Sequence, residues 1–158
     1  MPSTIQRMTA ICISAAILVG GAFAASHVPT VIAEETATTR KSLEVTVNRV
    51  RNSEGKIVML VLDNPQAYNT QNYDKAVGYQ EIPASTGSVQ AVFPELLEGP
   101  YAVVAFHDEN GNRDLDIEGQ IPSEGYTVSG ARDAYDEPPF QRAASVEPAR
   151  TVQLFYLD

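Results

Sequence analysis

The sequence predicts an all-β fold, a single antiparallel β-sandwich of immunoglobulin-like or prealbumin-like type with about seven to eight short strands. Short stretches rich in Val, Ile and aromatic residues alternate in polarity with a period of two, as strands with one buried face do. Turn signals separate these stretches at the spacing typical of a sandwich, and no long capped amphipathic helix or solenoid repeat interrupts them. The 158 residues provide for one domain of this kind.

Residues 1–24 are predicted to be a cleaved signal peptide. The stretch 8–19 is almost wholly apolar, follows a single basic residue at Arg7, and precedes the small-x-small cleavage motif Ala-Phe-Ala at 22–24. A membrane anchor is the alternative, because the apolar stretch is close to spanning length. Glycines at 20–21 interrupt it, however, and no basic cluster follows directly. We therefore expect export to the periplasm or the extracellular space, without stable membrane insertion after cleavage.

Cleavage would leave an acidic chain without cysteine. Cys12 lies inside the signal and is preceded by Ile11, where a lipidation site would have a small residue. The mature chain therefore has no disulfide or thiol chemistry. Losing Arg7 leaves 10 basic against 20 acidic residues, compared with a net charge of −9 for the whole chain. This balance argues against nucleic acid or an anionic membrane as the default partner.

The domain at 42–158 follows a leader at 25–41 that has no sustained period and is expected to be flexible. Its first strand alternates apolar residues at 43, 45 and 47 with polar ones, and its second is a nearly continuous apolar run at 56–62. A turn at 52–55 joins the two strands. We therefore expect them to pair as an antiparallel hairpin.

The remaining strands follow from the same two patterns. Residues 87–93 and 151–157 alternate, whereas Tyr101 to Phe106 is short, apolar and rich in Val, as expected of a buried strand. Residues 80–83 are expected to form a short edge strand and residues 125–129 another short strand. Residues 140–146 fit neither pattern clearly.

The longest irregular segment, residues 63–79, spreads Tyr68, Tyr73 and Tyr79 among amide side chains. A loop of this length in a compact domain is often functional, and tyrosines among amides can bind sugars or other planar ligands. Alternatively, the segment is a solvent-exposed loop without a binding role, or it contains a short helical turn. We take a surface for an unknown small molecule or protein as the hypothesis.

The largest group of potential ligand residues directly follows the predicted buried strand. Side-chain oxygens recur there at every second position, and an Asn-Gly pair predicts a tight turn. Such a series suits Ca²⁺, which prefers oxygen ligands. The loop is not an EF-hand, because positions six and twelve are Arg113 and Gly119. Glu118 or Glu124 could add a further ligand. The predicted metal ligands are Asp108, Asn110, Asn112, Asp114 and Asp116.

Two other interpretations of this loop remain open. The Asn-Gly pair is also a strong hairpin signal, so the segment could be a plain acidic hairpin without metal; carboxylates on one strand face repel by only about 1 kcal/mol per close pair in water. The other interpretation is that the protein is a small hydrolase that uses His107 with nearby carboxylates. Against catalysis, His107 and Asp108 are adjacent in a strand and point to opposite faces, and Ser129 lacks a nucleophile-elbow motif.

These motifs together resemble an uncharacterised family of bacterial exported proteins, catalogued as domain of unknown function 2141, over about residues 42–157. The resemblance implies an exported β-sandwich and supplies no activity. Arg113 and Thr127 stand where the family pattern has glycine. The residues that carry the resemblance are Gly99 to Val103, His107 to Asn112, Leu115-Asp116, Gly119, Ile121-Pro122, Glu124 to Tyr126, Ser129, Pro138 to Phe140 and Ala143.

The sequence therefore predicts an exported, non-catalytic β-sandwich that serves as a binding or structural module and carries a Ca²⁺ loop at 108–116. Fold alone does not give the ligand.

Overall fold

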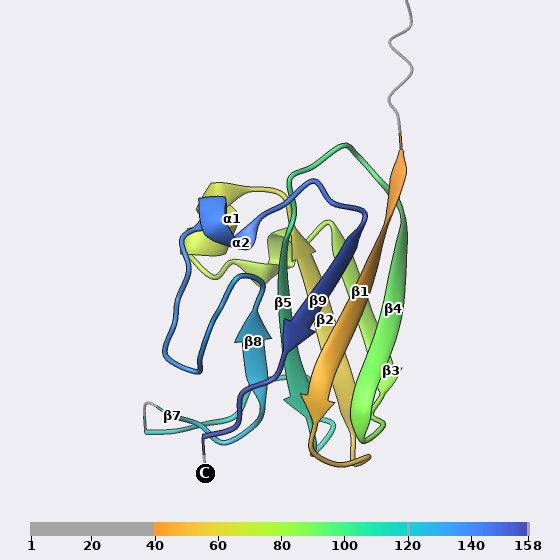
Figure 1. Ribbon diagram of the computed structural model, residues 1–158. Coiled ribbons are helices and arrows are strands. Elements are labelled where there is room, and N and C mark those ends of the chain that lie inside the picture. Colours follow the sequence, from red (N-terminus) through yellow and green to blue (C-terminus); the bar gives the residue numbers. More distant parts are fainter. Residues whose placement is uncertain (1–39, 120, 158) are drawn as a thin grey trace, which may run out of the picture. The chain divides into compact units, whose positions relative to one another are not determined.

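The computed structural model describes residues 40–119 and 121–157, which form two packed β-sheets and a small separate hairpin (Figure 1). The predicted all-β sandwich is confirmed, since strands dominate and the helices are short. The signal peptide predicted at 1–24 lies outside the described residues, as does the leader up to residue 39. None of the helices in the described ranges is long and apolar enough to span a membrane.

One sheet has three strands in the order β4 (Gly87–Leu96), β1 (Lys41–Val50) and β9 (Ala149–Gln153). β1 is antiparallel to β4 and parallel to β9. β9 can run parallel to β1 because a long stretch of chain, and not a tight turn, connects the two strands. The alternation predicted for β1 and β4 is confirmed over residues 43–47 and 89–93, where every second side chain is buried.

The other sheet has four antiparallel strands in the order β3 (Gly78–Pro83), β2 (Lys56–Leu62), β5 (Ala102–Asp108) and β8 (Tyr126–Val128). β2 and β5 are central and buried along almost their whole length. Their continuous apolar sequences require cover on both faces, which a central strand with packing on both sides receives. β3 is an edge strand, as predicted.

The predicted hairpin of the first two strands is wrong. β1 pairs with β4 and β9, whereas β2 pairs with β3 and β5 in the other sheet. Residues 51–55 therefore cross from one sheet to the other. Gly55 makes this crossing with a φ of 61°, and a Cβ there would lie 1.9 Å from the carbonyl oxygen of Asp108. The sequence signal for a turn before β2 was correct. However, both edges of β2 are paired, with β3 and with β5, so β2 does not pair with β1.

The main core lies between the sheets. Val45 and Val47 of β1 face Met59 of β2 and Val103 of β5, all fully buried. A second apolar cluster covers the opposite face of the four-stranded sheet and is centred on β2 and β5. Its members are Val58, Leu60, Leu62, Ala67, Val104 and Phe106.

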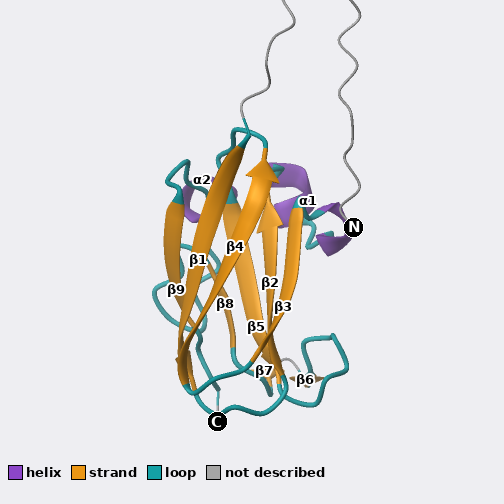
Figure 2. Cartoon of the chain, turned by 90° about the vertical axis from the view of Figure 1, so that its right-hand side faces the viewer, coloured by secondary structure: helices purple, strands orange, loops and turns teal. Residues whose placement is uncertain are grey.

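Short elements surround that second cluster. Figure 2 shows α1 (Pro65–Asn69) and α2 (Phe140–Ala143) at one end of the strands, and the hairpin of β6 (Ile117–Glu118) and β7 (Ile121–Pro122) at the other. A 3₁₀ turn, η1 (Tyr73–Lys75), continues the segment after α1. The outer face of the sheet is thus bordered at both ends but not closed over.

Candidate functional site

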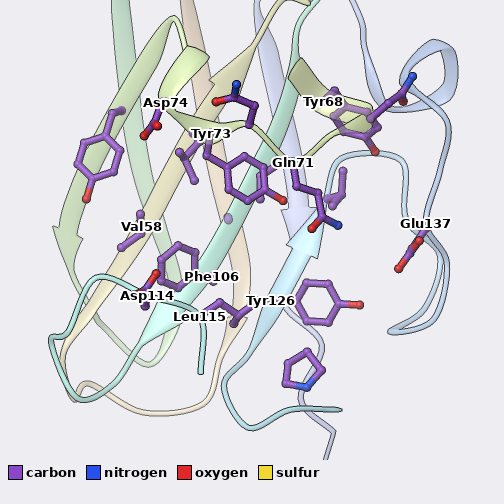
Figure 3. A pocket seen from close by; sticks show the side chains of 18 of the residues that line it. Val58, Tyr68, Gln71, Tyr73, Asp74, Phe106, Asp114, Leu115, Tyr126 and Glu137 are labelled. Carbon is purple, nitrogen blue, oxygen red and sulfur yellow. The ribbon is translucent and has the colours of Figure 1, made fainter. Parts of the chain in front are cut away.

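An open groove of about 980 Å³ lies over the outer face of the four-stranded sheet (Figure 3). Its floor is apolar and comes from β2, β5 and β8, with Val58, Val104 and Phe106 among its residues. The segment 68–74 and residues 137–139 contribute to its border. Residues 113–115, Ile117 and Pro122 also contribute to the border. The groove therefore combines segments that are far apart in the sequence.

The 63–79 segment is held by specific contacts, and its three tyrosines all line the groove. Asn64 caps α1 by accepting hydrogen bonds from the backbone N–H groups of Gln66 and Ala67. The Tyr68 ring packs edge-on against Phe140 at 5.7 Å, and its hydroxyl donates to the Pro138 carbonyl oxygen at 2.7 Å. Tyr68 is therefore a packing residue, which corrects the expectation of an exposed binding tyrosine at this position.

Tyr73 and Tyr79 keep the exposure expected of binding residues, at 39 % and 51 % of their surface. Burial raises the pKa of Tyr73, and Glu137 raises it further; the same two causes raise the pKa of Tyr126 on the facing strand. Burial also raises the pKa of Tyr68, to about 12. These hydroxyls therefore remain protonated at neutral pH, so the groove presents neutral aromatic rings.

The charged residues of the groove are mostly carboxylates. Asp74, Asp114 and Glu137 line it, with Arg113 as the one basic residue among its lining groups. The Arg113 guanidinium lies 2.8 Å from the Glu81 carboxylate. Hydrogen bonds from Lys56 and Tyr79, together with the Arg113 charge, lower the pKa of Glu81 to about 2. Arg113 therefore shares the Glu81 carboxylate with Lys56.

The first predicted metal ligand, Asp108, is fully buried at the end of β5. Its carboxylate accepts hydrogen bonds of 2.8 to 3.0 Å from the backbone N–H groups of Gly111, Asn112 and Arg113. Arg113 has a φ of 70°, the left-handed conformation that glycine favours. The resemblance implies glycine at this position, and the backbone has the corresponding shape.

The structure brings three further predicted ligands together. The side-chain amides of Asn110 and Asn112 both donate to the Asp116 carboxylate, the latter at 3.0 Å. Asp114 is exposed and lies on the groove instead. In residues 40–119 and 121–157, no group of three or more His, Cys, Asp or Glu side chains is placed to hold a metal ion. The Ca²⁺ assignment stays a prediction.

The two additional candidate metal ligands, Glu118 and Glu124, differ in their burial. Glu118 is exposed in β6. Glu124 is buried, and its carboxylate accepts hydrogen bonds from the backbone N–H groups of Glu109 and Asp116 at 2.9 and 3.2 Å. Burial raises the pKa of Glu124. Glu124 therefore ties the two ends of the acidic loop together.

His107, the residue of the hydrolase hypothesis, is fully buried, and both ring nitrogens have partners. Nδ1 lies 2.9 Å from the Tyr156 hydroxyl and Nε2 lies 2.8 Å from the Glu54 carbonyl oxygen. The nearest carboxylate, that of Glu109, is 3.7 Å from Nδ1 and is bound by Arg51. The Ser129 hydroxyl is buried elsewhere and donates to the Ala143 carbonyl oxygen. These groups hold the fold together and do not line the groove.

Several groove residues escaped the sequence reasoning. Tyr126 and Glu137 come from segments that the sequence marks only as a short strand or loop, and Leu115 lies in the acidic loop without having been proposed as a site residue. The available signal was the apolar run of β2, whose two faces both require cover. It indicates that something packs on the outer face of the sheet, but not which residues do.

The profile of a bacterial family described as "Uncharacterized protein conserved in bacteria (DUF2141)" matches residues 45–153. No curated protein and no solved structure matches the chain. The match covers every strand of both large sheets at least in part, as well as the groove.

Proposed function

Because this chain belongs to the uncharacterised bacterial family DUF2141, whose description names no activity, we propose its function from the groove. The domain is a non-catalytic binding module, and the groove over the outer face of the four-stranded sheet is its ligand site. The protein is exported, as its N-terminal sequence predicts. A concave surface with an apolar floor and a few polar groups at its border is the usual form of a ligand site.

The observation that carries the proposal is the exposure of aromatic rings over an apolar floor. Tyr73 and Tyr79 stay partly exposed although buried apolar residues lie beneath them. The floor residues Val58, Val104 and Phe106 are themselves buried, so the exposed surface of the groove belongs to these rings. Exposed aromatic surface around a concavity marks an interaction site on many soluble proteins.

We propose in addition that the loop 108–116 binds Ca²⁺ as a structural ion. Its support is the convergence of Asn110 and Asn112 on the Asp116 carboxylate. Turning either amide about its last side-chain bond would bring an oxygen toward Asp116, and a cation between them would stabilise that arrangement. With few carboxylates free, affinity should be in the weak range of extracellular modules, on the order of 10⁻⁴ to 10⁻³ M.

Amide chemical-shift mapping tests the ligand site. We would titrate the ¹⁵N-labelled protein with glucose, N-acetyltyrosinamide, benzoate and spermidine, which represent a neutral sugar, a neutral aromatic, an anion and an organic cation. We expect at least one compound to shift amides of Leu60, Tyr73, Val104 and Tyr126, and to leave the three-stranded sheet unchanged. Shifts confined to other surfaces, or none with any compound, would contradict the proposal.

A further inference from the structure

The border of the groove carries uncompensated negative charge. Asp74, Asp114 and Glu137 line it, and within the described part of the chain none of their carboxylates makes a hydrogen bond or ion pair. Arg113 offsets only one of these three charges, and its guanidinium also contacts the Glu81 carboxylate, which Lys56 shares. The net charge of −9 on the whole chain adds a long-range attraction for cations. A ligand with positive charge suits this site.

Aromatic rings stand between the carboxylates. Figure 3 shows Tyr73, Phe106 and Tyr126 in the middle of the groove. The faces of such rings attract organic ammonium groups, and the same surface packs against methylene groups. A hydrated metal cation would interact with the carboxylates but would make no use of the apolar floor. An organic cation with an aliphatic body would use both the charge and the apolar floor.

The charges lie on opposite sides of these rings. In Figure 3, Asp74 and Asp114 lie on one side of Phe106 and Tyr126, and Glu137 lies on the other. A linear molecule with an ammonium group at each end and methylene groups between matches this order. We infer that the groove binds an aliphatic polyamine. This inference rests on the proposed function and names the ligand class of the same site.

Calorimetric titration with spermidine at low ionic strength tests the inference. Two shorter probes of equal chain length, 1,5-diaminopentane and n-pentylamine, differ only in the second ammonium group. We expect the diamine to bind about three- to fivefold more tightly than the monoamine, as one additional exposed ion pair allows. Affinity should fall as salt is added. Equal affinity of the diamine and the monoamine would overturn the two-ended arrangement.

Variants locate the site. Glu137→Gln should weaken spermidine binding about three- to fivefold, and Asp74→Asn with Asp114→Asn about tenfold. Glu44→Gln is the matched control, because this carboxylate is exposed on the outer side of the three-stranded sheet; it should change affinity by less than about twofold. Equal losses in the control and the groove variants would show a diffuse charge effect and overturn the inference.

The ring contribution has its own pair of variants. Tyr73→Phe keeps the aromatic face and should retain spermidine affinity, whereas Tyr73→Ala should lose about threefold. Equal losses would contradict ring recognition. If glucose, benzoate or N-acetyltyrosinamide shifts the groove amides and spermidine does not, the polyamine class is wrong while the binding module stands. If no probe shifts them, both proposals fail.

Discussion

The acidic loop at 108–116 and the groove over the four-stranded sheet use similar residue types in opposite ways. In the loop, Asp108, Asn110 and Asp116 contact backbone and side-chain donors a few residues away. In the groove, Asp74 and Glu137 face solvent beside exposed rings, with no partner among the described residues. The loop has more polar groups per residue, but the groove has more carboxylates that are not already bonded within the protein.

The comparison shows that clustered polar residues are not by themselves a ligand site. Polar groups close in sequence can satisfy one another through short turns, which builds structure at little entropic cost. In the groove, Asp74 and Glu137 make no such contact among the described residues. Their free hydrogen-bonding capacity and charge remain for a ligand.

The largest expected effect tests whether the loop is structural. Asp108→Ala removes the acceptor of three backbone N–H groups and should lower the free energy of unfolding by about 2–4 kcal/mol. Asp114→Ala is the matched control in the same loop, and its exposed side chain should cost less than about 0.5 kcal/mol. Urea denaturation measures both. Equal losses would remove the distinction between a capping and a free carboxylate.

The second test divides the groove into packing and ligand-facing tyrosines. Tyr68→Ala should cost about 2–3 kcal/mol, because the half-buried ring packs on Phe140 and its hydroxyl binds the Pro138 carbonyl oxygen. Tyr73→Ala should cost less than about 1 kcal/mol, since the ring is partly exposed. Thermal and urea unfolding of the two variants give the comparison. A large loss for Tyr73→Ala would make it a packing residue as well.

Calcium would sharpen the comparison by adding a ligand to the loop. With a Kd on the order of 1 mM, about 10 mM Ca²⁺ should stabilise the fold by about 1.4 kcal/mol and raise its melting temperature by about 5 °C relative to chelator. Asp116→Ala should remove most of this shift, and Asp74→Ala, outside the loop, should retain it. The control is Mg²⁺ at equal ionic strength. Identical melting in chelator and Ca²⁺ would leave a plain acidic turn.

The smallest expected effect concerns two carboxyls at the base of the loop. The hydrogen bond from Arg51 lowers the pKa of Glu109 below its ordinary 4.5, whereas burial raises the pKa of Glu124 above it. The Glu109 contribution to stability is therefore lost as the pH falls through its lowered value. The Glu124 contribution is present below 4.5 and is lost as the pH rises through its raised value.

Carbon-detected NMR titration of the carboxyl groups checks these two directions. Glu109→Gln should flatten the loss of stability in acid, and Glu124→Gln should flatten the opposite trend. Two apparent pKa values on the same side of 4.5 would contradict the assigned environments.

Local features were predictable from the sequence because their causes are local. The alternation of Leu43, Val45 and Val47 gave the buried face of β1, and the nearly continuous apolar run at 56–62 gave the strand β2. The oxygen-rich series after β5 gave the turn at 108–116, although its use of Asp108 as a backbone acceptor was not anticipated. Neighbouring residues suffice to produce each of these patterns.

Only the tertiary structure decided which strands pair and which polar groups stay free. Periodicity states which side of a strand is buried but not its partner, so the hairpin of β1 with β2 was wrong and the pairing of β1 with β9 was not foreseen. The groove depends on bringing Tyr73, Leu115, Tyr126 and Glu137 to one sheet face. Whether a carboxylate has a partner depends on residues far away in the chain, and that information is absent from any local pattern.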